Sequence, residues 1–249
     1  MKVAIVTPYY KEDRRTIERC IASVRAQTVP TTHLLVADGH AQGWIDEQPG
    51  LRHLKLDQAH ADYGNTPRSV GGILAASEGF DAIGFLDADN WLAPDHVESC
   101  LRAAAAAPDE IDYIVARRHL VRDDGSVLPT TTVDDADGSH VDTNCYLLLP
   151  GAFHTLGQWG VMPKPLSAVG DRVYLKALRD QALRSVTVDH PTVNYLCTWA
   201  HVFEGIGEPA PDYAKSKIDM RPTVEWWHSL DRRDRNIVNR LAATDIAFQ

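Results

Sequence analysis

The start of the chain alternates apolar runs with an amphipathic segment, and this pattern restricts the possible folds more than any other feature. Residues 2–7 and 33–38 are largely apolar, as expected of strands buried on both faces of a parallel sheet. Between them, Ile17, Ile21 and Val24 recur at helical spacing. A strand, a helix and a second strand over this length predict a right-handed crossover unit, and therefore an α/β fold.

A third apolar run, residues 82–86, ends abruptly in two acids, Asp87 and Asp89, with Ala88 between them. Alternate side chains of a strand point to the same face, so the two carboxylates are expected to project together from the strand end. Neighbouring carboxylates repel each other unless a cation lies beside them, and Mg²⁺ and Mn²⁺ prefer oxygen ligands. A strand followed by an acidic turn and a helix cap is the competing interpretation, because Asp and Asn are favoured in both positions.

Polar residues follow all three apolar runs. Thr7 and Pro8 end the first run, Asp38 ends the second, and Asp87 and Asp89 follow the third. Ligands of open parallel sheets bind beyond the carboxyl ends of the strands. The three strand ends together therefore predict a ligand site at this edge of the sheet, more strongly than any one of them alone.

The composition argues against several classes of protein. The chain has 249 residues, a hydrophobic fraction of 44% and a net charge of −9, which argues against a nucleic-acid-binding surface. Its four cysteines are far apart and form no C-x-x-C pair, so neither a zinc site nor a disulfide framework is expected. No apolar run is long enough for a signal-peptide core or a transmembrane segment. We expect a cytoplasmic protein, and peripheral attachment to a membrane surface is compatible with this sequence.

Beyond the acids, the patterns predict helices and strands in one domain, without an internal repeat or a linker. Helices are expected at residues 67–78, 94–106, from 171 onward and 222–243, and strands at 54–56, 112–122, 141–149, 186–188 and 193–197. A hairpin turn is expected at 123–126, and loops are expected at 157–170 and 202–211. The later strands predict an antiparallel part added to the parallel sheet.

Several of these segments, taken in order, resemble family 2 glycosyltransferases of the GT-A fold. The first strand with its Pro-Tyr-Tyr loop, Ala-Asp-Gly at 37–39, Pro-Arg-Ser-Val-Gly at 67–71 and Leu-Asp-Ala-Asp-Asn at 86–90 are similar to motifs of that family. The similarity covers residues 2–100 and is weak from Pro108 onward. It implies an α/β fold with a Rossmann-like, mixed but mainly parallel sheet flanked by helices, and a smaller antiparallel part on the acceptor side.

The resemblance also implies an activity within a single domain. Residues 1–107 would form the nucleotide-sugar-binding half, 108–221 the acceptor and catalytic half, and 222–249 a C-terminal helix. The implied activity is metal-dependent transfer of a sugar, with inversion, from a UDP-, GDP- or dTDP-linked donor to a hydroxyl group. The acceptor would be a glycan, a lipid-linked sugar or a small molecule, and the cofactor would be Mn²⁺ or Mg²⁺.

The resemblance assigns roles to individual residues. The nucleotide sugar would be bound by Thr7, Pro8, Tyr10, Asp38, Arg68, Asp87 and Ala88. For Arg68 the alternative role is to hold the Asp-x-Asp loop. The metal would be held by Asp89, with Asp87 and His201 as further ligands. Residues 169–173 resemble the segment that carries the catalytic base, which makes Asp171 the predicted base, although Gly170 stands where the family has Glu. Asp is also a favoured helix N-cap, and that structural role for Asp171 is an alternative.

Two other functions fit parts of the pattern. Nucleotidyltransferases also combine a Rossmann-like sheet with acidic metal ligands, but they usually carry a Gly-rich phosphate loop after the first strand, where this chain has Pro8-Tyr9-Tyr10. A non-catalytic nucleotide-sugar-binding protein would keep the first half of the site and lack the base. Metal-dependent nucleotide binding without turnover would favour the binding protein over a glycosyltransferase.

Overall fold

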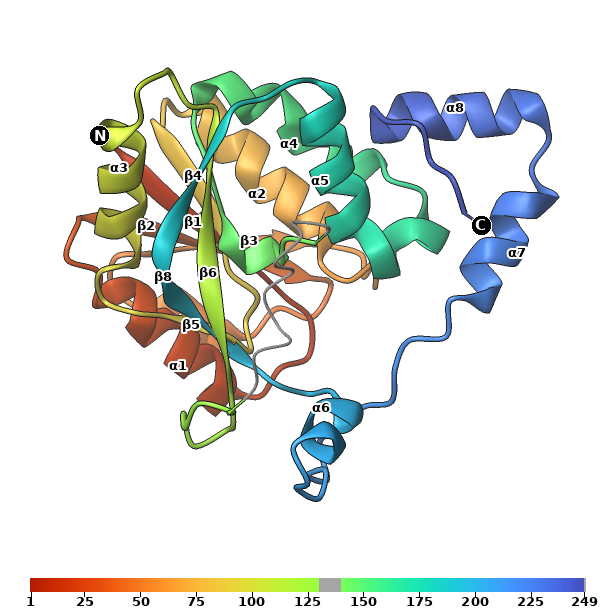
Figure 1. Ribbon diagram of the computed structural model, residues 1–249. Coiled ribbons are helices and arrows are strands. Elements are labelled where there is room, and N and C mark those ends of the chain that lie inside the picture. Colours follow the sequence, from red (N-terminus) through yellow and green to blue (C-terminus); the bar gives the residue numbers. More distant parts are fainter. Residues whose placement is uncertain (130–139, 249) are drawn as a thin grey trace.

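In the computed structural model, which describes residues 1–129 and 140–248, the apolar runs at the start of the chain form the parallel half of a sheet (Figure 1). The strands of this half are β1 (Val3–Tyr9), β2 (Thr31–Asp38), β3 (Leu51–Leu56) and β4 (Ala82–Phe85). β1 pairs in parallel with both β2 and β4, and β2 pairs in parallel with β3. The predicted crossover unit is confirmed.

The second half of the sheet contains the antiparallel part. Its strands are β5 (Trp91–Leu92), β6 (Tyr113–Val121), β7 (Tyr146–Leu148) and β8 (Ser185–Leu196). β7 pairs antiparallel with both β4 and β6, β8 pairs in parallel with β6, and β5 pairs antiparallel with β8. The order across the sheet is β3-β2-β1-β4-β7-β6-β8-β5, so the sheet is mixed and mainly parallel, as predicted.

Helices cover both faces of the sheet (Figure 1). The α-helices are α1 (Arg14–Arg25), α2 (Asn65–Ser77), α3 (His96–Ala106), α4 (Leu156–Val161), α5 (Gly170–Asp180), α6 (Ala200–Gly205), α7 (Arg221–Ser229) and α8 (Arg232–Ala242). Short 3₁₀ helices are η1 (Gly43–Glu47), η2 (Thr143–Cys145), η3 (Pro150–Thr155) and η4 (Lys164–Val169). No helix among the described residues combines the length and the apolar character needed to cross a bilayer.

The side chains of β1 alternate between two cores. Val3 and Ile5 pack in one core with residues of α1 and α3, whereas Ala4 and Val6 pack in another with residues of α2, α4 and α5. Successive side chains of a strand point to opposite faces, and here both faces are covered by helices. This double burial explains why the run is apolar at consecutive positions.

The prediction of a loop at residues 157–170 is wrong, because this segment forms α4 and η4. The Trp159 side chain in α4 is 1% exposed, and its ring centroid lies 4.3 Å from that of Tyr174 and 6.2 Å from that of Phe85. Burial of this large aromatic side chain stabilises a helical backbone in a segment whose Gly and Pro content favours a loop.

Three predictions in the second half of the chain are wrong in extent. The strands expected at 186–188 and 193–197 form one strand, β8, which is bulged where it pairs with β6. The strand expected at 141–149 is reduced to β7, because η2 precedes it. The loop expected at 202–211 begins within α6, where Phe203 is buried. Each difference arises from non-local pairing or burial, which the local pattern does not encode.

The single C-terminal helix predicted at residues 222–243 is two helices. α7 ends at Ser229, and the Asp231 side chain accepts a hydrogen bond of 2.8 Å from the backbone N–H of Asp234 at the start of α8. This N-cap starts a new helix after a short extended break. The segment therefore changes direction where one continuous helix was expected.

Helix α2 lies unusually close to the sheet at Gly71. A Cβ atom at this position would be 2.5 Å from Cγ1 of Val6 and 2.9 Å from Cγ2 of Val36. The helix can approach β1 and β2 this closely only because residue 71 has no side chain. Gly157 in α4 differs, since a Cβ atom there would have no neighbour within 4 Å.

We expect Gly71→Ala to destabilise the protein by about 1–3 kcal/mol, because overpacking outweighs the gain of about 1 kcal/mol in helix propensity. Gly157→Ala is the matched control and should be neutral or stabilising by up to about 1 kcal/mol. Urea unfolding of the two variants measures this difference. Equal effects of the two substitutions would contradict the packing argument.

Candidate active site

Most of the predicted site residues surround one cavity. This cavity has a volume of about 450 Å³, and its lining includes residues at or just after the carboxyl ends of β1, β2 and β4. Six predicted residues line it, namely Pro8, Tyr10, Asp38, Asp87, Ala88 and Asp89. The topology of the parallel sheet therefore brings the three strand ends together as predicted.

The two acids lie in a turn after β4 and not in the strand itself. β4 ends at Phe85, and the backbone N–H of Asn90 donates a hydrogen bond of 3.0 Å to the carbonyl oxygen of Asp87. The expectation that Asp87 and Asp89 project from one face of a strand is therefore wrong in its geometry. The Asn90 side chain joins the turn to β8, because its Oδ1 accepts a hydrogen bond of 2.8 Å from the backbone N–H of Leu196.

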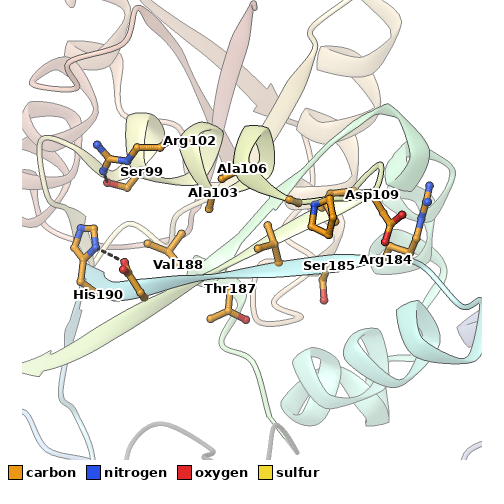
Figure 2. Close-up of a pocket in the computed structure, with 15 residues that line it drawn as sticks. Ser99, Arg102, Ala103, Ala106, Asp109, Arg184, Ser185, Thr187, Val188 and His190 are labelled. Atoms are coloured by element: carbon orange, nitrogen blue, oxygen red, sulfur yellow. Dashed lines mark hydrogen bonds and ion pairs between the residues drawn. The ribbon is translucent and has the colours of Figure 1, made fainter.

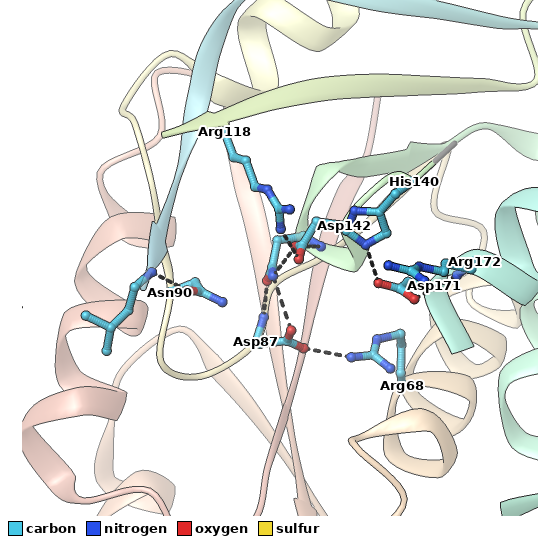
Figure 3. Close-up of polar contacts among 10 residues, drawn as sticks. Arg68, Asp87, Asn90, Arg118, His140, Asp142, Asp171 and Arg172 are labelled. Atoms are coloured by element: carbon cyan, nitrogen blue, oxygen red, sulfur yellow. Dashed lines mark hydrogen bonds and ion pairs between the residues drawn. The ribbon is translucent and has the colours of Figure 1, made fainter. Parts of the chain in front are cut away.

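Arg68 neutralises Asp87 from inside the protein (Figure 3). The residue is 2% exposed, and its Nη2 donates to Oδ1 of Asp87 at 2.7 Å while Nη1 donates to Oδ1 of Asn65 at 3.1 Å. Its guanidinium also lies 4.9 Å from the ring centroid of Trp159, within cation–π range. Arg68 is absent from the residues that line the cavity, so it holds the acidic turn from behind.

Asn144 connects Asp87 to the second half of the chain. It is fully buried, and its Nδ2 donates to Oδ2 of Asp87 at 3.2 Å and to Oδ1 of Asp142 at 2.6 Å. Asp142 forms an ion pair with Arg118, whose guanidinium lies 4.7 Å from the ring centroid of Tyr195. The acidic turn is therefore held by Asn144, which follows Asp87 by more than fifty positions.

Asp89 receives no such support. Among the described residues, no side chain donates a hydrogen bond to its carboxylate. Burial, followed by the charges of Asp87 and Glu12, raises the pKa of Asp89 to about 7, and Lys215 opposes this shift. Burial also raises the pKa of Asp87, against the lowering effect of the Arg68 charge. Surroundings that disfavour a charged carboxylate are the electrostatic setting in which a cation binds.

His201 lies away from the two acids. It lines a neighbouring cavity, and burial together with the charge of Lys217 lowers its pKa. In the part of the chain that the structure describes, no group of three or more His, Cys, Asp or Glu side chains is arranged to hold a metal ion. The predicted set of Asp87, Asp89 and His201 is therefore not assembled, because α6 carries His201 to the other cavity.

Asp38 organises one wall of the first cavity. Its side chain is nearly inaccessible, and it accepts hydrogen bonds from the backbone N–H groups of His60 at 2.8 Å and Ala61 at 2.9 Å. Gly39 permits the close turn, because its φ is +73° and a Cβ atom there would lie 2.4 Å from the backbone nitrogen of Ala59. A carboxylate can accept more than two hydrogen bonds, so these two backbone contacts leave room for another donor. The hydrogen bond from a nucleotide base to Asp38 stays a prediction.

Pro8 and Tyr10 supply a flat apolar part of the lining. The Tyr10 ring contacts the His40 ring edge-on, with 4.6 Å between centroids. Pro8 packs against Gly64, where a Cβ atom would lie 2.9 Å from Cγ of Pro8. An aromatic ring and a proline ring in the lining of a cavity can contact the face of a nucleotide base.

The prediction for Thr7 is wrong. Its side chain is fully buried, its Oγ1 lies 2.8 Å from Nε2 of His33, and it does not line the cavity. The cause is the alternation of β1, which places Thr7 on the same face as Val3 and Ile5, against α1. The Thr7 hydroxyl therefore hydrogen-bonds within the protein core.

A second cavity of about 780 Å³ adjoins the first at Tyr195, which lines both. Asp171 lines this second cavity, and its Oδ1 accepts a hydrogen bond of 2.7 Å from the backbone N–H of Arg172. Helix α5 begins at Gly170, and its N-cap position is Val169. The alternative role of Asp171 as a helix N-cap is therefore wrong.

His140 is the partner of Asp171 (Figure 3). Its Nε2 donates a hydrogen bond of 2.5 Å to Oδ2 of Asp171. Burial favours the neutral forms of both groups, but their mutual hydrogen bond and charges outweigh it. The pKa of Asp171 is consequently lowered and the pKa of His140 is raised. The two side chains therefore form an ion pair on the wall of the second cavity.

The sequence patterns did not identify Arg118, His140, Asp142 or Asn144 as site residues. All four follow Pro108, where the family resemblance is weak. The one local signal is the spacing of His140, Asp142 and Asn144 at alternate positions immediately before the apolar strand β7. Their partners lie in distant segments, so this spacing alone does not reveal what they bind.

A further cavity, of about 670 Å³, lies between α3 and β8 (Figure 2). Val188 of β8 and Ala103 of α3 face each other across it, and Arg102 and Asp109 lie on its rim. None of the predicted site residues lines this cavity. The candidate active site therefore consists of the two cavities that meet at Tyr195.

We expect Arg68→Met to destabilise the protein by about 2–3 kcal/mol. Loss of one partner of a buried ion pair costs about 3–5 kcal/mol, and the Asp87 side chain, which is 35% exposed, is partly solvated. Adding Asp87→Asn to this variant should recover part of the loss, since it removes the unpaired charge. Urea unfolding of the single and double variants measures the coupling, and purely additive effects would contradict it.

Comparisons with known proteins give similarity in both sequence and fold. No protein-family model matches the chain. It is 32% identical over 103 residues to the succinoglycan biosynthesis protein ExoW of Rhizobium meliloti (strain 1021). The match covers 39% of this chain and 32% of ExoW, so it spans about a third of that relative.

The fold is similar to that of S. aureus TarS. The crystal structure of TarS 1-349 in complex with UDP superposes with a TM-score of 0.60 at 14% identity, covering 83% of this chain and 63% of the TarS chain. For the complex with UDP-GlcNAc the TM-score is 0.59 at 11% identity, with coverages of 97% and 71%. These similarities confirm the predicted α/β GT-A fold. The chain is therefore similar to TarS in its fold and to ExoW in a segment of 103 residues.

Proposed function

We propose that this chain is an inverting glycosyltransferase that moves a sugar from a nucleotide-diphosphate sugar to an acceptor hydroxyl group. The observation that carries the proposal is the junction of two cavities at Tyr195. Asp87 and Asp89 line one cavity, and Asp171 lines the other. A single displacement needs charge stabilisation at the leaving group and a base beside the attacking hydroxyl. The first cavity would supply the charge stabilisation, and the second would supply the base.

The proposed donor is a UDP-linked sugar. TarS, which has the same fold, has been crystallised with UDP and with UDP-GlcNAc, and this supports the choice of base. Pro8 and Tyr10 would contact the base, and Asp38 would accept a hydrogen bond from it. GDP- and dTDP-linked donors are the alternatives that a binding experiment separates from UDP.

The donor set of the first cavity fits a hard divalent cation, Mn²⁺ or Mg²⁺. The Asp89 carboxylate is buried near the carboxylate of Asp87, and burial, followed by the charges of Asp87 and Glu12, raises its pKa to about 7. Asp89 would hold the ion, with Asp87 as a second carboxylate and the donor diphosphate supplying further oxygens. When bound, the ion would neutralise the charge that develops on the leaving diphosphate. His201 is left out of this proposed set, because it lines the other cavity.

Asp171 is the proposed general base. Its carboxylate would take the proton of the acceptor hydroxyl while the acceptor oxygen forms a bond to the anomeric carbon. The bond from that carbon to the diphosphate oxygen breaks at the same time, and the diphosphate leaves with the electron pair. Attack and departure on opposite faces invert the configuration, and the acceptor would be a glycan, a lipid-linked sugar or a small molecule.

Nucleotide binding tests the donor side of this proposal. We expect UDP with Mn²⁺ to raise the melting temperature more than UDP alone, because a ligand stabilises a protein according to its concentration relative to Kd. Asp89→Asn should remove the metal-dependent part of this shift, and Asp109→Asn, an exposed acid outside both cavities, should not. No stabilisation by UDP, GDP or dTDP with or without Mn²⁺ would count against the whole proposal.

Turnover tests the base. We expect Asp171→Asn to lower the rate of UDP release from UDP-GlcNAc by about 10²–10⁴-fold, the usual contribution of a general base, while leaving UDP affinity unchanged. Release of UDP is followed with a coupled assay, and affinity by calorimetry. Full activity of the variant would show that Asp171 is not the base. Metal-dependent UDP binding by a wild type that turns over no donor would instead favour a nucleotide-sugar-binding protein.

A further inference from the structure

The ion pair between His140 and Asp171 joins two distant segments on the wall of the second cavity (Figure 3). The side chain of His140 is 17% exposed and that of Asp171 is 26% exposed, so each is accessible from the cavity and largely surrounded by protein. Oδ2 of Asp171 accepts from His140, and Oδ1 accepts from the backbone of Arg172. Both oxygens are therefore fixed, and each keeps a lone pair for a further hydrogen bond.

Among the described residues, the charged groups around this pair come from β6, from α5 and from the segment before η2. Arg118 from β6 and Asp142 from the segment before η2 form their own ion pair, in which both side chains are 11% exposed. Arg172 follows Asp171 in α5, and its charge also favours the ionised form of Asp171. In the part of the chain that the structure describes, His140 and Arg172 are the cationic groups that lower the pKa of Asp171, and the Arg118 charge lowers the pKa of His140.

The residue before Asp171 cannot perform this function. Gly170 has no side chain, and a Cβ atom there would lie 3.1 Å from Nδ2 of Asn65. Asn65 is itself held in place because its Oδ1 accepts a hydrogen bond from Arg68. The polar support for Asp171 is therefore supplied from another part of the chain, by His140.

We propose that His140 is a positioning residue for catalysis, which holds the Asp171 carboxylate in the orientation that receives the acceptor proton. This inference rests on the proposed glycosyltransferase function and adds a residue to it. The hydrogen bond to Oδ2 fixes the rotation of the carboxylate, so that a lone pair of Asp171 can face an acceptor in the second cavity. Orientation of this kind matters because a displacement of about 1 Å can cost about 10²-fold in rate.

The proposed sugar transfer needs no reactant besides the nucleotide sugar and the acceptor. The acceptor hydroxyl gives its proton to Asp171, its oxygen forms the new bond to the anomeric carbon, and the diphosphate leaves with the electrons of the broken bond. His140 gains and loses no covalent bond, and its hydrogen bond to Asp171 persists as the carboxylate becomes neutral. The cationic partner weakens Asp171 as a base, but it keeps the carboxylate ionised at lower pH.

Two substitutions at residue 140 separate orientation from charge. His140→Ala removes both the hydrogen-bond donor and the charge, whereas His140→Gln keeps an N–H donor and removes the charge. We expect His140→Ala to lower kcat for UDP release by about tenfold or more with an unchanged KM for the donor, and His140→Gln to retain more of the activity. His154→Gln, which changes an exposed histidine bonded to Gln181, is the matched control.

The pH profile of kcat provides a readout that a purely structural role would not change. Activity requires ionised Asp171, so kcat falls as the pH decreases through the pKa of that residue. Loss of the cation raises this pKa, and we expect the acidic limb of the profile to move to higher pH in both His140→Ala and His140→Gln. A structural defect would lower kcat in proportion to the unfolded fraction and would leave the position of the limb unchanged.

The pair can also be measured without a donor or an acceptor. In protein labelled with ¹⁵N-histidine, the His140 imidazole, assigned from its absence in His140→Gln, should titrate above the ordinary value of about 6.5. Asp171→Asn should lower this midpoint. An unchanged His140 midpoint in Asp171→Asn, or wild-type kcat in His140→Ala across the pH range, would overturn the inference. A wild type that turned over no donor would instead refute the proposed function, and the catalytic role of His140 with it, while the titration would still report whether the pair exists.

Discussion

The buried guanidinium of Arg68 is the interaction on which the rest of the site depends. A charge that is 2% exposed must be neutralised within the protein, and Asp87 provides that neutralisation at 2.7 Å. The same contact ties α2 to the acidic turn, and the ring of Trp159 ties α4 to the guanidinium. Because Asp87 already has a cationic partner, the two acids of the motif differ, and Asp89 is the one whose charge lacks compensation.

Asp87, the partner of Arg68, also links the two cavities through a series of contacts. Asn144 donates hydrogen bonds to both Asp87 and Asp142. Asp142 forms an ion pair with Arg118, and the Arg118 guanidinium stacks over the ring of Tyr195. Tyr195 lines both cavities, so one chain of polar contacts runs from the proposed donor side to the proposed acceptor side. A substitution in this chain should therefore affect both cavities, even where it touches no ligand.

The sequence was most informative for residues that lie at the end of an apolar strand. The apolar runs predicted the parallel half of the sheet, and the polar strand ends predicted one shared cavity with Asp38, Asp87 and Asp89 in its lining. Thr7 was misassigned, although its place in the alternation with Val3 and Ile5 already puts it on the face against α1. The partners Asn144 and His140 could not be predicted, because they reach the site only through the insertion of β7 between β4 and β6, a non-local pairing without a local signal.

The position of β7 also has a consequence for the order of folding. The edge of β4 is covered by a strand that begins some sixty residues later, and β6 in turn pairs with β8 across a similarly long separation. Contacts between distant segments form slowly, because the loop between them must close first. We expect β1, β2 and β3, which pair across short connections, to form early on the nascent chain, and the long-range pairs β1–β4, β4–β7 and β6–β8 to form as later steps.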